Sequence, residues 1–128
     1  MKANELRIGN LFIDKYSKQP MKVLELLRSG NIVFDIECFG RWQAEPIPLT
    51  EQWIKKLGFE LKYKDMTIGL VKGCYILESS FLPNNKKWIF RKITDVENSY
   101  ALKEIEYVHQ LQNLYFALTE RELTRVDG

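Results

Sequence analysis

The sequence predicts an α+β fold. A small bent antiparallel sheet or SH3-like barrel comes first, then a short middle helix, a second antiparallel segment and a C-terminal amphipathic helix. Apolar and polar residues alternate over most of the chain, and the period becomes that of a helix from Val108. Because 128 residues, 45% of them hydrophobic, suit one core, we expect a single domain over 1–128.

Residues 1–48 are expected to form barrel-like strands joined by tight turns. From Ile32 to Cys38, apolar residues occupy every second position and acids two of the positions between them, the pattern of a half-buried strand. Pro46 and Pro48 end the last of these strands, because proline donates no N–H to a ladder.

The middle helix is expected over 49–58. Thr50 is a suitable N-cap, and Leu49 and Ile54 flank it as a hydrophobic staple. Gly58 is well placed to end the helix in a left-handed conformation.

Residues 59–107 are expected to form further antiparallel strands. FELKYK alternates cleanly, MTIGLVKGCYILE breaks into two strands near Gly73, and KKWIFRKI follows a turn. YALKEIEY is predicted as the last strand, although its composition would equally suit a helix.

The C-terminal helix is expected over 108–123, with Thr119 and Glu122 at capping-box spacing for an extra turn over 120–123. At 100° per residue one apolar stripe forms, and we expect aspartate at position 111 or 118 to unfold the protein. The stripe comprises Val108, Leu111, Leu114, Tyr115 and Leu118.

Composition excludes several classes of protein. The net charge of +2 favours neither disorder nor a strongly basic nucleic-acid binder. Cys38 and Cys74 lie in predicted strands without metal-ligand spacing, so we expect buried, reduced thiols and no metal. The absence of a leader or long apolar run predicts a cytoplasmic protein with no membrane partner.

No pattern favours an enzyme or a cofactor. The segment with Gly69 and Gly73 does not continue with the Lys-Ser/Thr pair of a phosphate-binding loop. No serine or cysteine can be assigned from the sequence as a nucleophile beside His109. Carboxylates two residues apart are what any half-exposed strand displays. We therefore expect a non-catalytic protein.

Five side chains are candidate contacts for a protein partner: Trp42, Trp88, Phe90, His109 and Phe116. The alternative is structural. Trp88 and Phe90 would then pack inward, His109 would help cap its helix, and Gln112 and Asn113 would bond to neighbouring loops or strands. A second hypothesis is nucleic-acid binding by the basic and aromatic stretch at 86–92, through Lys86, Lys87, Trp88, Arg91 and Lys92.

The blocks MKANELRIGN, PIPLTEQWIKKLGF and YVHQLQNLYFALT resemble a family of small uncharacterised proteins from prophages and mobile elements of gut bacteria. Members tend to have glycine after the final threonine of the third block, whereas this chain has Glu120. The resemblance implies an accessory role that engages a host or phage protein, and no reaction. The start of the chain also resembles an SH3-like small barrel, which selects no function.

Overall fold

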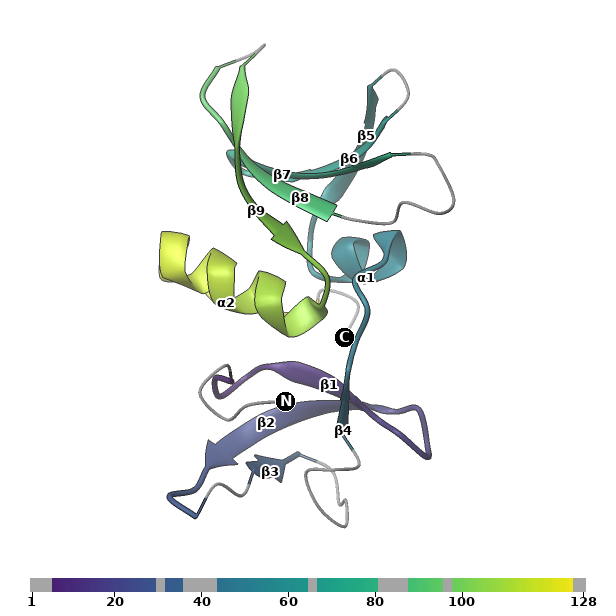
Figure 1. Cartoon of the computed structure of the whole chain (residues 1–128), viewed down its shortest axis with the longest axis vertical. Helices are drawn as coiled ribbons and strands as arrows, with labels where there is room; N and C mark the ends of the chain where they lie inside the picture. Colours follow the sequence, from purple (N-terminus) through teal and green to yellow (C-terminus); the bar gives the residue numbers. More distant parts are fainter. Residues whose placement is uncertain are drawn as a thin grey trace. The chain divides into compact units, whose positions relative to one another are not determined.

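The computed structural model describes residues 6–29, 32–35, 44–64, 67–80, 88–95 and 98–125. Within them, the strands form two antiparallel sheets, of four and five strands, and there are two helices, which confirms the α+β class (Figure 1). The chain divides into two compact units, Met1–Pro48 with Tyr107–Glu122 and Leu49–Glu106 with Leu123–Gly128. The second unit is therefore mostly an insertion in the sequence of the first, and a single functional domain stays a prediction.

The sheet of the first unit is open. Its strand order is β3-β2-β1-β4, so β3 and β4 lie at opposite edges and the described strands close no barrel. Pro46 lies in the edge strand β4, where a missing N–H costs no ladder bond. The strands are β1 (Leu11–Asp14), β2 (Pro20–Leu26), β3 (Ile32–Phe34) and β4 (Ala44–Pro46). Their buried core contains Leu6, Phe12, Met21, Val23, Phe34 and Ala44.

Helix α2 (Val108–Thr119) belongs to the first unit and contacts β1. The extra turn predicted over 120–123 is wrong, because Glu120 has a left-handed backbone (φ 60°) that reverses the chain. The Thr119 hydroxyl donates to the Tyr115 carbonyl at 2.7 Å and accepts from the Arg121 N–H at 3.1 Å. These bonds satisfy groups that the ended helix leaves open.

The buried face of α2 is rotated from the predicted stripe. Leu118 is 43% exposed, whereas His109 and Gln112 are buried at 4% and 1%. The expected burial of Leu118 is therefore wrong, and a charge at this position reaches water. Periodicity counted only apolar residues, and here polar side chains occupy part of the buried face. The buried residues are Val108, His109, Leu111, Gln112 and Tyr115.

The sheet of the second unit is a five-stranded antiparallel meander in the order β5-β6-β7-β8-β9. Each of its predicted strands is present, including the last one, whose composition also suited a helix. Cys74 lies in the turn after Gly73 and is exposed, which corrects the expectation of a buried thiol in a strand. The strands are β5 (Glu60–Lys64), β6 (Thr67–Lys72), β7 (Tyr75–Ser80), β8 (Trp88–Ile93) and β9 (Ser99–Ile105).

Helix α1 (Glu51–Lys56) begins and ends as its sequence signals predict. The Thr50 hydroxyl accepts from the Trp53 N–H at 3.2 Å, as an N-cap should. Leu49 and Ile54, the two staple residues, are both buried. Gly58 follows the helix with φ 95°, a backbone conformation that residues with a Cβ rarely adopt.

Candidate functional site

Two predicted aromatic contacts, Trp88 and Phe90, are part of the core of the second unit. Trp88 is 5% exposed, and its indole N–H donates to the Leu49 carbonyl at 3.0 Å. Phe90 is fully buried and stacks on Tyr75 with ring centroids 5.2 Å apart. They alternate with exposed Ile89 on β8 and therefore share its inward face. The inward-packing alternative is confirmed, and their proposed role as exposed partner contacts is corrected.

His109 is also buried, in the first unit. Its ring stacks on Phe12 at 5.0 Å between centroids and on Tyr107 at 5.9 Å. The N–H of the N-cap residue Tyr107 donates to the Gln110 side chain at 3.1 Å, so Gln110 takes the capping role considered for His109. His109 therefore packs within its unit and presents no surface there.

Gln112 joins α2 to the chain around β1. Its amide oxygen accepts from the Leu11 N–H at 2.8 Å, and its amide nitrogen donates to the Gly9 carbonyl at 3.1 Å. The Gln112 side chain thus hydrogen-bonds two backbone groups, as a neighbouring strand would. Asn113 accepts from the Asn10 amide at 2.8 Å. The alternative in which these amides bond to neighbouring segments is confirmed.

Arg7 makes a charged contact that no sequence pattern predicted. Its guanidinium forms an ion pair with Glu122, donates to the Asn113 side chain at 3.0 Å and lies 4.0 Å from the centroid of the half-buried Phe116 ring. The nearby turn at Gly9 was the only local signal for this cluster. The side chains of Arg7, Asn10, Asn113 and Glu122 bond to one another, which indicates a structural network.

The stretch at 86–92 does not form the predicted basic patch within the described residues. Trp42, Lys86 and Lys87 lie outside those residues. The Arg91 guanidinium donates to the Ser99 hydroxyl at 2.9 Å and the Ser99 carbonyl at 3.1 Å, and lies 3.9 Å from Glu78. Lys92 is half-buried and lies on the face of β8 opposite to Arg91, because adjacent residues of a strand point to opposite faces.

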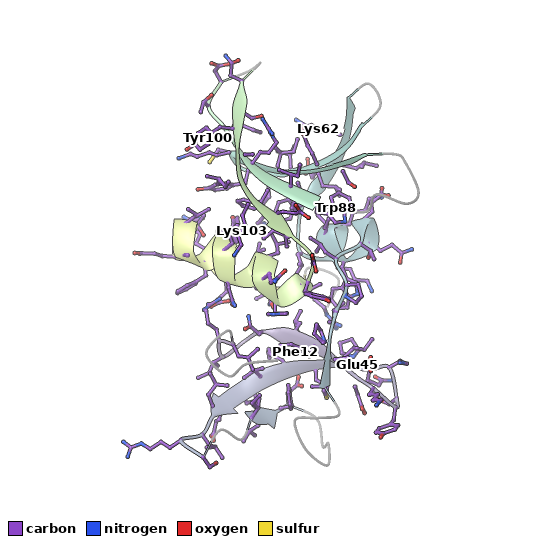
Figure 2. The ribbon with its side chains drawn as sticks, viewed as in Figure 1. Phe12, Glu45, Lys62, Trp88, Tyr100 and Lys103 are labelled. Atoms are coloured by element: carbon purple, nitrogen blue, oxygen red, sulfur yellow. The ribbon has the colours of Figure 1, made fainter. Side chains whose placement is uncertain are left out.

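Strand register sorts the side chains of the five-stranded sheet onto two faces, since directly paired residues share a face. The core face carries two successive rows, one of Lys72, Tyr75, Lys92 and Tyr100 and the other of Leu61, Leu70, Leu77, Phe90 and Lys103. The outer face carries Glu60, Lys62, Glu78, Ile89, Arg91 and Glu104, among others. Figure 2 labels Tyr100 and Lys103 on β9 and Lys62 on β5.

Strand β9 is an exposed edge of this sheet. Every side chain from Tyr100 to Glu104 is exposed, with Tyr100 at 47% and Leu102 at 37%. The register shifts between Phe90 and Arg91, which places Leu102 outside the regular pairing with β8. The strand thus displays two large side chains beside a backbone edge that pairs with no other described strand.

The described residues contain no group of three or more histidine, cysteine or acidic side chains that could hold a metal. None of the described helices combines the length and apolarity needed to span a membrane. Comparisons of the chain with protein-family models, curated proteins and solved structures give no match.

Proposed function

We propose that this chain is a non-catalytic binding module of phage or mobile-element origin that engages a host or phage protein in the cytoplasm. The observation that supports it is β9, a seven-residue edge strand with five consecutive exposed side chains. An extended segment of a partner can add to such an edge through backbone hydrogen bonds, and neighbouring side chains give specificity.

The other sheet edges are less suited to strand addition. In the first unit, edge strands β3 and β4 have three residues each, and β4 contains Pro46. In the second, β5 has five residues against seven in β9, so it offers fewer backbone groups to an added strand. Leu102 on β9 offers apolar area, and Tyr100 adds an amphipathic ring of the kind enriched at interfaces.

The test is capture of proteins from nuclease-treated bacterial lysate by the immobilised full chain. Leu102→Lys should reduce the retained partner at least about tenfold, because a lysine on an edge opposes strand addition. Leu118→Lys is the matched control, since Leu118 is 43% exposed on α2 and should retain the partner unchanged.

The captured protein is then purified and its effect on hydrogen exchange is measured. Backbone amides of 99–105 should gain protection in the complex, and those of β3 and β4 should not. Loss of capture upon nuclease treatment, equal capture by both variants, or protection confined to other segments would each contradict the proposal.

A further inference from the structure

A row of alternating lysine and tyrosine side chains crosses the core face of the five-stranded sheet. Lys72 pairs with Tyr75, Tyr75 with Lys92, and Lys92 with Tyr100. Neighbouring strands lie about 4.8 Å apart, so the row spans roughly 14 Å across four strands. Lys103, opposite Phe90 in the next row, extends it along β9 (Figure 2).

The row has a buried floor and a polar surface. Tyr75 is 7% exposed and stacks on Phe90, whereas Tyr100 and Lys103 are exposed and Lys72 and Lys92 are half-buried. Burial, followed by the neighbouring Cys74, raises the pKa of Tyr75, and Lys92 and Tyr100 also influence it. Direct strand pairing places Lys72, Lys92 and Tyr100 next to one another in this row, with Tyr75 between Lys72 and Lys92.

The acidic side chains named for this sheet lie on its outer face, together with Lys62 and Arg91. The acids Glu60, Glu78 and Glu104 are on the outer face, whereas the two described rows of the core face carry lysines and no acid. Within the part of the chain that the structure describes, Lys72, Lys92 and Lys103 form no ion pair. The row thus presents positive charge that its own sheet does not neutralise.

We propose that this lysine–tyrosine row binds single-stranded nucleic acid, with phosphates on Lys72, Lys92 and Lys103 and a base stacked on Tyr100. Lysines along a strand-crossing path and an exposed ring are the two elements of such sites. Unpaired bases can stack on an open ring, whereas those in a duplex stack on each other. This site shares Tyr100 with the proposed protein contact on β9, but it does not include Leu102.

Fluorescence anisotropy with labelled oligo-dT and oligo-U of about 12 nucleotides tests the site, at about 50 and 200 mM salt. The full chain should bind both, with affinity that falls as salt rises. The combined variant Lys72→Gln, Lys92→Gln, Lys103→Gln should reduce the slope of log affinity against log salt by about 2, because each lost contact removes roughly 0.7.

The matched control is Lys55→Gln, Lys56→Gln, Lys62→Gln, which removes the same charge from exposed positions off the row. It should keep the wild-type slope. Equal weakening by both combined variants would indicate unspecific attraction and overturn the proposal, as would failure of the full chain to bind at the lower salt concentration.

Tyr100 separates nucleic acid from other polyanions. Tyr100→Ala should weaken binding about five- to 150-fold, the usual effect of losing one stacked base, and Tyr100→Phe should not. Unchanged affinity in Tyr100→Ala, competition by inorganic polyphosphate as strong as by oligonucleotide, or equal binding of duplex DNA would each overturn the proposal. Leu102→Lys should abolish protein capture without weakening oligonucleotide binding, so the two proposals fail independently.

Discussion

The two units differ in what they bury. In the first, Asn10, His109 and Gln112 are buried polar side chains, and they connect helix α2 to the segment around β1. In the second, Ser79 is the one polar side chain among the described buried residues, and the sheet packs through apolar and aromatic groups such as Phe90. Buried amides require specific partners, whereas apolar packing tolerates more variation. The stability of the first unit should therefore depend on the geometry of its buried hydrogen bonds, and that of the second on the volume of its buried side chains.

The largest expected effect is in α2. Leu111 is fully buried, and Leu111→Asp places an unpaired charge in the first unit, which should cost more than about 4 kcal/mol of the free energy of unfolding. Leu118→Asp, at a 43% exposed position of the same helix, should cost less than about 0.5 kcal/mol. Urea unfolding of both variants measures the contrast. Similar losses in the two would restore the apolar stripe predicted from the sequence.

The second unit should respond to loss of volume. Phe90→Ala removes a fully buried ring and should cost about 3 to 5 kcal/mol. Native-state hydrogen exchange reports which amides open, and faster exchange should be greatest in β7, β8 and β9. Phe90→Leu, which keeps most of the volume, should recover the larger part of the loss; no recovery would contradict packing by volume.

A smaller loss of stability should follow from removing the two hydrogen bonds of Gln112 in the first unit, which we call the amide bridge. Gln112→Leu keeps the size of the side chain but leaves the Leu11 N–H and Gly9 carbonyl without these bonds, at a cost of about 1 to 3 kcal/mol. Gln52→Leu, at an exposed position of α1, is the control and should be near neutral. Thermal unfolding measures both. A neutral Gln112→Leu would show that the bridge does not require polar partners.

The smallest expected effect is stabilising. Glu120 ends α2 with φ 60°, a conformation in which glycine carries no Cβ penalty. Glu120→Gly should raise stability by about 0.5 to 1 kcal/mol. Ala117→Gly, in the last turn of the same helix, should lower stability, because glycine has a lower helix propensity than alanine. Destabilisation by Glu120→Gly would mean that the glutamate side chain stabilises the fold by more than the left-handed backbone costs.

Glu120 is the position at which the resemblance to the prophage family leads us to expect glycine. The left-handed backbone found there is the conformation that glycine favours. The family assignment itself stays a prediction.

Local signals determined much of the fold. Thr50 and Gly58 bound α1 because capping groups act within one turn of the chain, and the alternation around Leu61 and Phe90 identified strands because side chains of a strand alternate between two faces. Even the ambiguous segment from Tyr100 to Tyr107 was placed as a strand by this pattern up to Ile105.

Tertiary structure decided which side chains are buried and which meet. Helical periodicity located α2, but Phe12, more than ninety positions earlier, stacks on His109 and helps to define the buried face, and Gln112 bonds around Leu11. The candidate nucleic-acid row was likewise hidden, because Lys72, Lys92 and Tyr100 share one side of the sheet only through strand register. Sequence patterns report local geometry, whereas these contacts depend on pairing between distant segments.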